Sequence, residues 1–153
     1  ANSMKKLLFV CHGNICRSPM AAFMMQELVR EAGLAGQIET DSAAVSREEI
    51  GNPIYPPAQR QLRAHGVPFT DHRARQMTRA DYAAFDLLIG MDGSNLSAMR
   101  RICGGDPDGK LRLLMAFAGT PCDVADPWYT GDFDAAWRDI ETGCRALLET
   151  LRA

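Results

Sequence analysis

The stretch Leu7–Pro19, which reads LLFVCHGNICRSP, carries an apolar run into a short polar loop. The run Leu7–Val10 is typical of a buried strand, and apolar residues recur at helical spacing from Ala21 to Ala32. Pro19 suits the first turn of that helix, because the N–H that proline lacks would have no partner there. The sequence therefore predicts a strand, a tight loop and a helix in direct succession.

The loop between this strand and helix holds the residue types that an anion site needs. Cys11 stands at its start and Arg17 at its end. Gly13 allows a sharp backbone turn, and Asn14 tolerates a left-handed backbone better than most residues do. Loop N–H groups and the helix dipole favour a bound phosphate and an ionised thiol. We expect Cys11 to be a nucleophile and Arg17 to donate to two phosphate oxygens; the simpler alternative is a buried cysteine beside a solvated arginine.

Apolar runs and amphipathic stretches alternate along the rest of the chain, which indicates an α/β layer fold around a mostly parallel sheet. Thr78 and Asp81 have the spacing of a capping box, so a helix should begin after Thr78. In open sheets of this kind ligands bind beyond the carboxyl ends of the strands, where Cys11 stands. Strands are expected at 7–10, 38–41, 87–91 and 111–115, and helices at 18–32, 57–65, 79–85, 94–102 and 132–151.

The length of 153 residues fits one domain. Lys and Arg total 17 against 19 for Asp and Glu, and this balance argues against a basic surface for nucleic acid. No apolar run approaches the roughly 20 residues of a membrane span, and the start lacks the apolar region of a secretory signal. Residues 1–3 precede Met4 and look like a remnant of an expression vector. We expect a single domain over residues 4–153, cytoplasmic and without membrane insertion.

The five cysteines lack the regular pairing of a disulfide framework or a zinc site. Cys11, His12 and Cys16 could be drawn as metal ligands, but a closed site would need a fourth partner. We therefore expect neither a metal ion nor a cofactor. Cys16 lies five positions from Cys11 and could close a disulfide with an oxidised nucleophile; the alternative is a small buried residue.

The segment Val10–Ser18, VCHGNICRS, resembles the phosphate-binding loop of the low-molecular-weight protein tyrosine phosphatases. The resemblance runs from about Met4 nearly to the C-terminus. It implies a three-layer α/β fold with a four-stranded parallel sheet flanked by helices and the phosphate-binding loop after the first strand. Further segments resemble the family in family order: TDSA at 40–43, HGV at 65–67, HRARQ at 72–76, FD at 85–86, MDGSNL at 91–96 and DPWY at 126–129.

The function that the resemblance implies is that of a cysteine-dependent phosphatase, which hydrolyses phosphotyrosine and small aryl phosphates through a phosphocysteine intermediate. Its partners would be phosphotyrosine-containing proteins or peptides, with inorganic phosphate as product and inhibitor, and the enzyme would be a monomer or weak dimer. The expected phosphate-binding residues are His12, Gly13, Asn14, Ile15, Cys16, Arg17 and Ser18.

A phosphate ester needs its leaving oxygen protonated, and the loop itself holds no acid. Asp126 is the candidate, because Pro127 fixes the backbone after it and Trp128 and Tyr129 offer aromatic surface for a phenyl ring. Asp-Pro is also an ordinary turn dipeptide. The family resemblance of DPWY favours Asp126 over the rival carboxylates, which are Asp41, Asp92 and Asp123.

Four supporting residues complete the expected site. The hydroxyl of Ser18 can donate to the Cys11 sulfur, although Ser18 can equally be a helix N-cap. By resemblance, Asn14, Ser42 and His65 form a hydrogen-bonded support for the loop. The alternatives are a polar strand end for Ser42 and a histidine at a helix C-terminus, favoured by the dipole, for His65.

Three alternative functions share parts of this pattern. Arsenate reductases of this type need further cysteines near the third strand, where this chain reads LIGM at 88–91. Phosphoarginine phosphatases resemble the family but carry Thr at the position of Ile15. A non-catalytic phosphopeptide-binding module predicts loss of the nucleophile or the acid, and both Cys11 and Asp126 are present.

The chain departs from the family pattern between Ala44 and Ile54. The family commonly has a Gly-rich segment there with an aromatic residue that lines the cleft, whereas this chain reads AVSREEIG at 44–51. We expect Glu49 to belong to the substrate cleft together with Trp128 and Tyr129. If the segment faces the substrate, charge partly replaces stacking and peptides with basic residues beside the phosphotyrosine are favoured.

Overall fold

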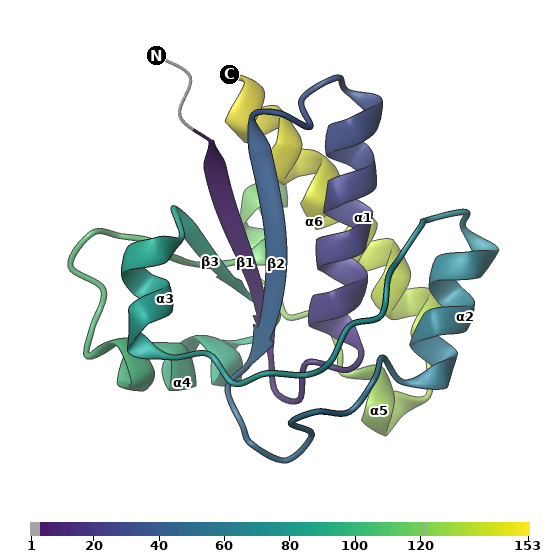
Figure 1. Ribbon diagram of the computed structural model, residues 1–153, viewed down its shortest axis with the longest axis horizontal. Helices are drawn as coiled ribbons and strands as arrows, with labels where there is room; N and C mark the ends of the chain where they lie inside the picture. Colours follow the sequence, from purple (N-terminus) through teal and green to yellow (C-terminus); the bar gives the residue numbers. More distant parts are fainter. Residues whose placement is uncertain (1–3, 121) are drawn as a thin grey trace.

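The structure, a computed structural model, describes residues 4–120 and 122–153; residues 1–3, interpreted above as a vector remnant, lie outside the described residues. Its centre is a four-stranded sheet in the order β2-β1-β3-β4 (Figure 1). Every adjacent pair of strands is parallel, which confirms the predicted sheet. The strands are β1 (Lys5–Cys11), β2 (Ile38–Ala44), β3 (Leu87–Gly90) and β4 (Leu111–Leu113).

Helices cover both faces of this sheet, so the fold has the three layers expected (Figure 1). One face carries α1 (Arg17–Glu31) and α6 (Phe133–Arg152), with α2 (Pro56–Ala64) beside them. The other face carries α3 (Arg79–Ala84) and α4 (Gly93–Cys103). A one-turn helix, α5 (Pro127–Thr130), lies near the lower ends of the strands in Figure 1.

Strand β1 is buried on both of its faces. Leu7 and Phe9 belong to the core under α1 and α6. Leu8 and Val10 belong to the core under α3 and α4. Because side chains alternate between the faces of a strand, a central parallel strand must be apolar throughout, and this explains the unbroken run from Leu7 to Val10.

Local signals explain most of the helix boundaries. The backbone N–H of Thr78 donates to Oδ2 of Asp81 at 2.8 Å, which confirms the predicted capping box at the start of α3. The strand expected at 111–115 ends at Leu113 and continues as a 3₁₀ helix, η1 (Leu114–Ala118). The sequence reading also missed α5, because a single turn leaves too little periodicity to recognise.

No helix within residues 4–120 and 122–153 combines the length and the apolar character needed to cross a bilayer.

Candidate active site

The loop between β1 and α1 lies at the carboxyl end of the sheet. In the sheet, β1 has β2 on one side and β3 on the other. This is the position at which open α/β sheets bind ligands. Asn14 has a φ of 62°, the left-handed backbone that asparagine tolerates better than most residues. The loop therefore curls directly in front of the N-terminus of α1, where the helix dipole favours an anion.

The sulfur of Cys11 sits at the bottom of this loop and is surrounded by hydrogen-bond donors. The backbone N–H groups of Asn14 and Ser18 donate to Sγ at 3.3 and 3.4 Å. The hydroxyl oxygen of Ser18 lies 3.0 Å from the same sulfur. Ser18 is not the helix N-cap, since that position belongs to Cys16. These donors can stabilise negative charge on the nucleophile.

A buried polar network holds the loop in shape from behind. The side-chain N–H₂ of Asn14 donates to the hydroxyl oxygens of Ser18 at 2.8 Å and Ser42 at 3.0 Å. Its carbonyl oxygen accepts from the backbone N–H of Arg75 at 3.2 Å and lies 3.0 Å from Nε2 of His72. Asn14, Ser18 and Ser42 are almost completely buried, so each unpaired polar group would carry a desolvation cost.

The histidine that takes part in this polar network is His72, and the expectation that His65 supports the loop is wrong. His65 follows the last turn of α2, and its ring stacks on Trp137 of α6 with centroids 4.5 Å apart. By contrast, Nε2 of His72 also lies 3.4 Å from the hydroxyl of Ser42. The chain after His72 runs beside the end of β2, where Ala44 bridges to Gln76, and this long-range pairing has no signature in the local sequence.

Arg17 is buried and held from three sides. Its Nη1 donates to Oδ2 of Asp92 at 2.7 Å and to the carbonyl of Val124 at 2.8 Å. Its Nη2 donates to Oδ2 of Asp126 at 3.3 Å. Burial alone would lower the pKa of Arg17, but the Cys11 sulfur and the two carboxylates outweigh it and raise the pKa. The guanidinium therefore stays charged and fixed below the loop.

Asp92 is a site residue that the sequence reading considered only as a rival acid. It is the N-cap of α4, where its Oδ1 accepts from the backbone N–H of Asn95 at 2.8 Å, while Oδ2 binds Arg17. Burial would raise the pKa of Asp92, but hydrogen bonds from Arg17, Asn95 and Ser94 prevail and hold the pKa below its ordinary value. Asp92 is thus an ionised anchor for the guanidinium; the sequence signals for it were the family-like segment MDGSNL at 91–96 and the capping pattern DGSN within it.

Asp126 faces the loop from the start of α5. Its Oδ1 accepts from the backbone N–H of Trp128 at 3.1 Å, which makes Asp126 the N-cap of this helix and fixes the carboxylate. The carboxylate is accessible from the cavity, with 23% of its side chain exposed. Trp128 packs against Tyr55, with ring centroids 4.8 Å apart, so that wall is aromatic.

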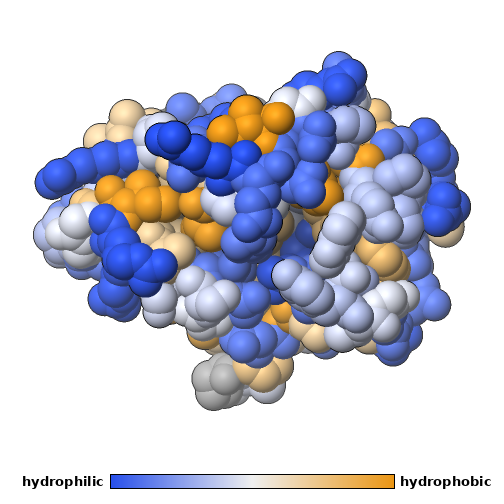
Figure 2. Space-filling model, turned by 90° about the horizontal axis from the view of Figure 1, so that it is seen from below, coloured by the Kyte–Doolittle hydropathy of each residue, from blue (hydrophilic) through white to orange (hydrophobic). Residues whose placement is uncertain are grey.

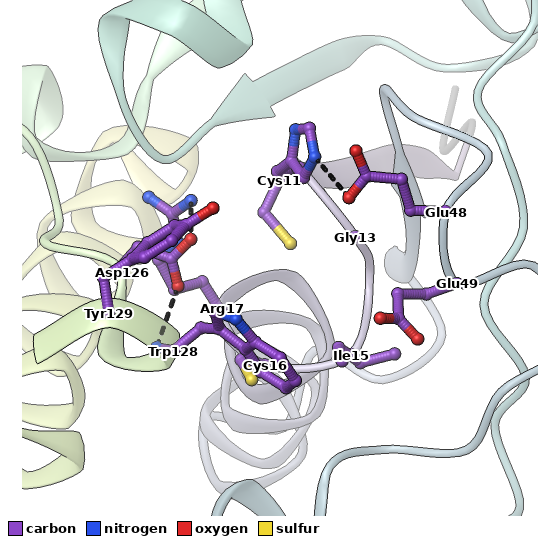
Figure 3. Close-up of a pocket in the computed structure, with 11 residues that line it drawn as sticks. Cys11, Gly13, Ile15, Cys16, Arg17, Glu48, Glu49, Asp126, Trp128 and Tyr129 are labelled. Atoms are coloured by element: carbon purple, nitrogen blue, oxygen red, sulfur yellow. Dashed lines mark hydrogen bonds and ion pairs between the residues drawn. The ribbon is translucent and has the colours of Figure 1, made fainter. Parts of the chain in front are cut away.

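These side chains enclose one cavity of about 100 Å³ (Figure 3). Asp126 and Tyr129 stand on one side of it, and Glu48 and Glu49 on the other. The face of the molecule at this end of the sheet is mostly hydrophilic, with hydrophobic side chains between the hydrophilic ones (Figure 2). The residues lining the cavity are Cys11, His12, Gly13, Ile15, Cys16, Arg17, Glu48, Glu49, Asp126, Trp128 and Tyr129.

Cys16 lines the same cavity as Cys11. Burial, followed by the negative charges of Cys11 and Asp126, raises the pKa of the Cys16 thiol far above its ordinary value. The two cysteines of this loop therefore have different surroundings. Hydrogen-bond donors surround the sulfur of Cys11, whereas burial keeps Cys16 as a neutral thiol.

Known proteins are similar to this chain in sequence and in fold. The family model described as "Low molecular weight phosphotyrosine protein phosphatase" matches residues 6–153. The low molecular weight protein-tyrosine-phosphatase YfkJ of Bacillus subtilis is 38% identical over 151 residues, 97% of each chain. The human low molecular weight phosphotyrosine protein phosphatase is 37% identical over 150 residues, 95% of this chain and 94% of its own.

The crystal structure of YfkJ superimposes with a TM-score of 0.95 and 39% identity, and the match covers 98% of this chain and 96% of that one. The names of these relatives favour phosphotyrosine hydrolysis over arsenate reduction, phosphoarginine hydrolysis or mere phosphopeptide binding. With a matching family model over nearly the whole chain and a loop built around Cys11 and Arg17, the chain belongs to the low molecular weight phosphotyrosine protein phosphatases and is a cysteine-dependent protein-tyrosine phosphatase.

Proposed function

We propose that Cys11, Arg17 and Asp126 carry out phosphotyrosine hydrolysis in this enzyme, on proteins and on small aryl phosphates. One observation supports this most strongly. The Cys11 sulfur lies among N–H donors in a loop that also contains Arg17, and Asp126 reaches the same guanidinium from a helix more than 100 residues later. Nucleophile, phosphate-binding group and acid thus meet in one cavity.

In the first step the Cys11 thiolate attacks phosphorus, an S–P bond forms and the bond to the tyrosine oxygen breaks. Asp126 donates its proton to that oxygen, so the leaving group departs as a neutral phenol. The loop N–H groups and Arg17 bind the equatorial oxygens, on which negative charge is spread. Asp92 and the carbonyl of Val124 bind Nη1 and Asp126 binds Nη2, so the Nε–H and the second N–H of Nη2 remain for the phosphoryl group.

In the second step the Asp126 carboxylate takes a proton from water, the water oxygen attacks phosphorus and the S–P bond breaks. The Cys11 thiolate leaves, and the hydroxyl of Ser18, 3.0 Å from the sulfur, can donate to it as the charge returns. Inorganic phosphate remains in the loop. We therefore propose that phosphate is both product and inhibitor.

The cellular setting is part of the same proposal. All five cysteines are free thiols, which suits a reducing compartment such as the cytoplasm. We propose a cytoplasmic enzyme that acts as a monomer or weak dimer on phosphotyrosine-containing proteins. Cys16 would protect Cys11 by forming a disulfide with it after oxidation.

The decisive experiment compares hydrolysis of three otherwise identical peptides, which carry phosphotyrosine, phosphoarginine or phosphoserine, with and without EDTA. We expect release of phosphate from the phosphotyrosine peptide, unaffected by EDTA, and none from the Cys11→Ser variant. Faster hydrolysis of phosphoarginine would instead assign the phosphoarginine activity, and turnover by Cys11→Ser would refute the covalent mechanism.

A further inference from the structure

One wall of the cavity carries charge that the two chemical steps do not use. Glu48 and Glu49 belong to residues 45–52, which we call the acidic segment. Both side chains line the cavity across from Asp126 and Tyr129 (Figure 3). A phosphotyrosine with its phosphate in the loop would place its ring between these two walls, and the acidic segment would then lie next to the residues that flank it.

Backbone hydrogen bonds join the start of the acidic segment, and the chain shortly after it, to the phosphate-binding loop. The N–H of Ser46 donates to the carbonyl of His12 at 3.1 Å. On the far side, the N–H of Tyr55 donates to the carbonyl of Ile15 at 2.9 Å. The position of the two glutamates relative to the bound phosphate is therefore determined by the loop itself.

Glu49 is seated directly on the loop. A Cβ atom at Gly13 would lie 3.2 Å from Cγ of Glu49, so the missing side chain of Gly13 provides the space that Glu49 fills. The side-chain N–H₂ of Asn52 donates to Oε2 of Glu49 at 2.6 Å. These contacts hold one carboxylate at the edge of the phosphate site.

Glu48 points to the same edge from further out. Its Oε2 lies 3.0 Å from Nε2 of His12, and 68% of its side chain is exposed. A carboxylate in this position can also reach a cation that approaches from solvent. Because water screens exposed pairs, its effect on binding will be moderate and will depend on salt.

The bottom and the rim of the cavity therefore favour groups of opposite charge. The loop N–H groups and Arg17 favour a dianion at the bottom, whereas Glu48 and Glu49 make the rim acidic. Negative residues beside a phosphotyrosine would be repelled by this rim, and positive residues would be attracted to it.

We propose, resting on the phosphotyrosine activity above, that Glu48 and Glu49 determine substrate specificity: the enzyme prefers phosphotyrosine peptides with Lys or Arg next to the phosphotyrosine. The preference belongs to the acidic segment, since the opposite wall offers mainly the aromatic surface of Trp128 and Tyr129. Trp128 and Tyr129 contact the aromatic ring of the phosphotyrosine, and Glu48 and Glu49 discriminate between the residues that flank it.

The test measures kcat/KM for three phosphotyrosine peptides that differ only in the two residues flanking the phosphotyrosine, which are Arg, Gln or Glu. We expect the wild-type enzyme to prefer the Arg peptide over the Glu peptide by roughly tenfold at low ionic strength, and by much less at high ionic strength. Failure of the proposed function is a separate result, namely no hydrolysis of any of the three peptides.

The variants Glu48→Gln, Glu49→Gln and their double variant remove charge while they keep the hydrogen bonds to His12 and Asn52. Loss of negative charge will strengthen binding of every phosphate ester, so the readout is the ratio between peptides within one variant. The matched control is Glu31→Gln, the same change at the far end of α1 and about 20 Å along the helix from Arg17.

The proposal requires that the Arg-to-Glu ratio falls toward one in the double variant and is unchanged in Glu31→Gln. A ratio that stays high in the double variant would overturn it, since the selection would then lie elsewhere. Equal rates on all three peptides with the wild-type enzyme would overturn it as well.

Discussion

Nη1 of Arg17 lies 2.7 Å from Oδ2 of Asp92, a residue 75 positions further along the chain. The arginine belongs to the first helix and the aspartate to the cap of α4, on the opposite face of the sheet. This ion pair crosses the carboxyl end of β3 and joins the two helical layers at the active site. It prevents the guanidinium from rotating away from the phosphate position.

The variant Asp92→Asn should lower kcat more than it raises KM, because the amide no longer holds the guanidinium in its transition-state position. It should also reduce the free energy of unfolding by about 1–3 kcal/mol, since a buried charge loses its partner. The pKa of Asp92 lies below its unfolded value, so the stabilisation is present above that value and is lost as pH falls through the folded pKa. Urea unfolding at neutral pH and at about pH 3 checks this, and equal losses at both pH values would contradict it.

The variant Cys11→Ser should have no measurable turnover while it keeps the fold and binds phosphate. The serine hydroxyl is not ionised near neutral pH, but the loop N–H groups that bind phosphate remain. Phosphate titration by calorimetry checks binding.

Arg17→Lys should be almost as inactive as Arg17→Ala, because a point charge cannot donate to two oxygens at once. A lysine variant near wild-type activity would contradict the bidentate role of Arg17.

The variant Asp126→Ala should slow hydrolysis of phenyl phosphate by roughly 10²–10⁴-fold and that of a dinitrophenyl phosphate far less. A general acid matters in proportion to the basicity of the leaving group, and dinitrophenolate leaves without a proton. Equal losses on both substrates would assign Asp126 to the positioning of Arg17 and α5, with which it shares hydrogen bonds.

Mild peroxide should inactivate the enzyme reversibly. We expect oxidation of Cys11 to a sulfenic acid, followed by attack of the Cys16 sulfur, release of water and formation of a Cys11–Cys16 disulfide. Mass spectrometry should detect this linkage, and a thiol reductant should restore activity. In Cys16→Ser recovery should fail as Cys11 is oxidised further; full recovery in that variant would remove Cys16 from this role.

The two histidines should differ when each is replaced. His72→Ala removes a partner of the Asn14 carbonyl and should lower kcat by roughly tenfold or more, with a smaller change in KM, since the loop loses support. His65→Ala removes a ring stacked on Trp137 and should lower Tm with kcat nearly unchanged. Equal effects of the two variants on kcat would contradict a specific role of His72.

The loop and its surroundings show which features are readable from local sequence. The apolar run Leu7–Val10 and the helical spacing after it set the boundaries of β1 and α1 within a few residues. Asn14 takes the left-handed backbone that asparagine tolerates, and Asp81 caps α3 as its spacing predicts. Such features depend on the steric preferences and hydrogen bonds of neighbouring residues, so a short stretch contains all the information they need.

By itself, then, the sequence determined the strand, the loop and the helix around Cys11, and with them the anion site. Only the tertiary structure decided which distant groups complete that site: His72 in place of His65, Asp92 as the anchor of Arg17, and Glu48 beside His12. These contacts span 36 to 75 residues. The physical reason is that they depend on how the sheet and its helices pack, which no local preference encodes.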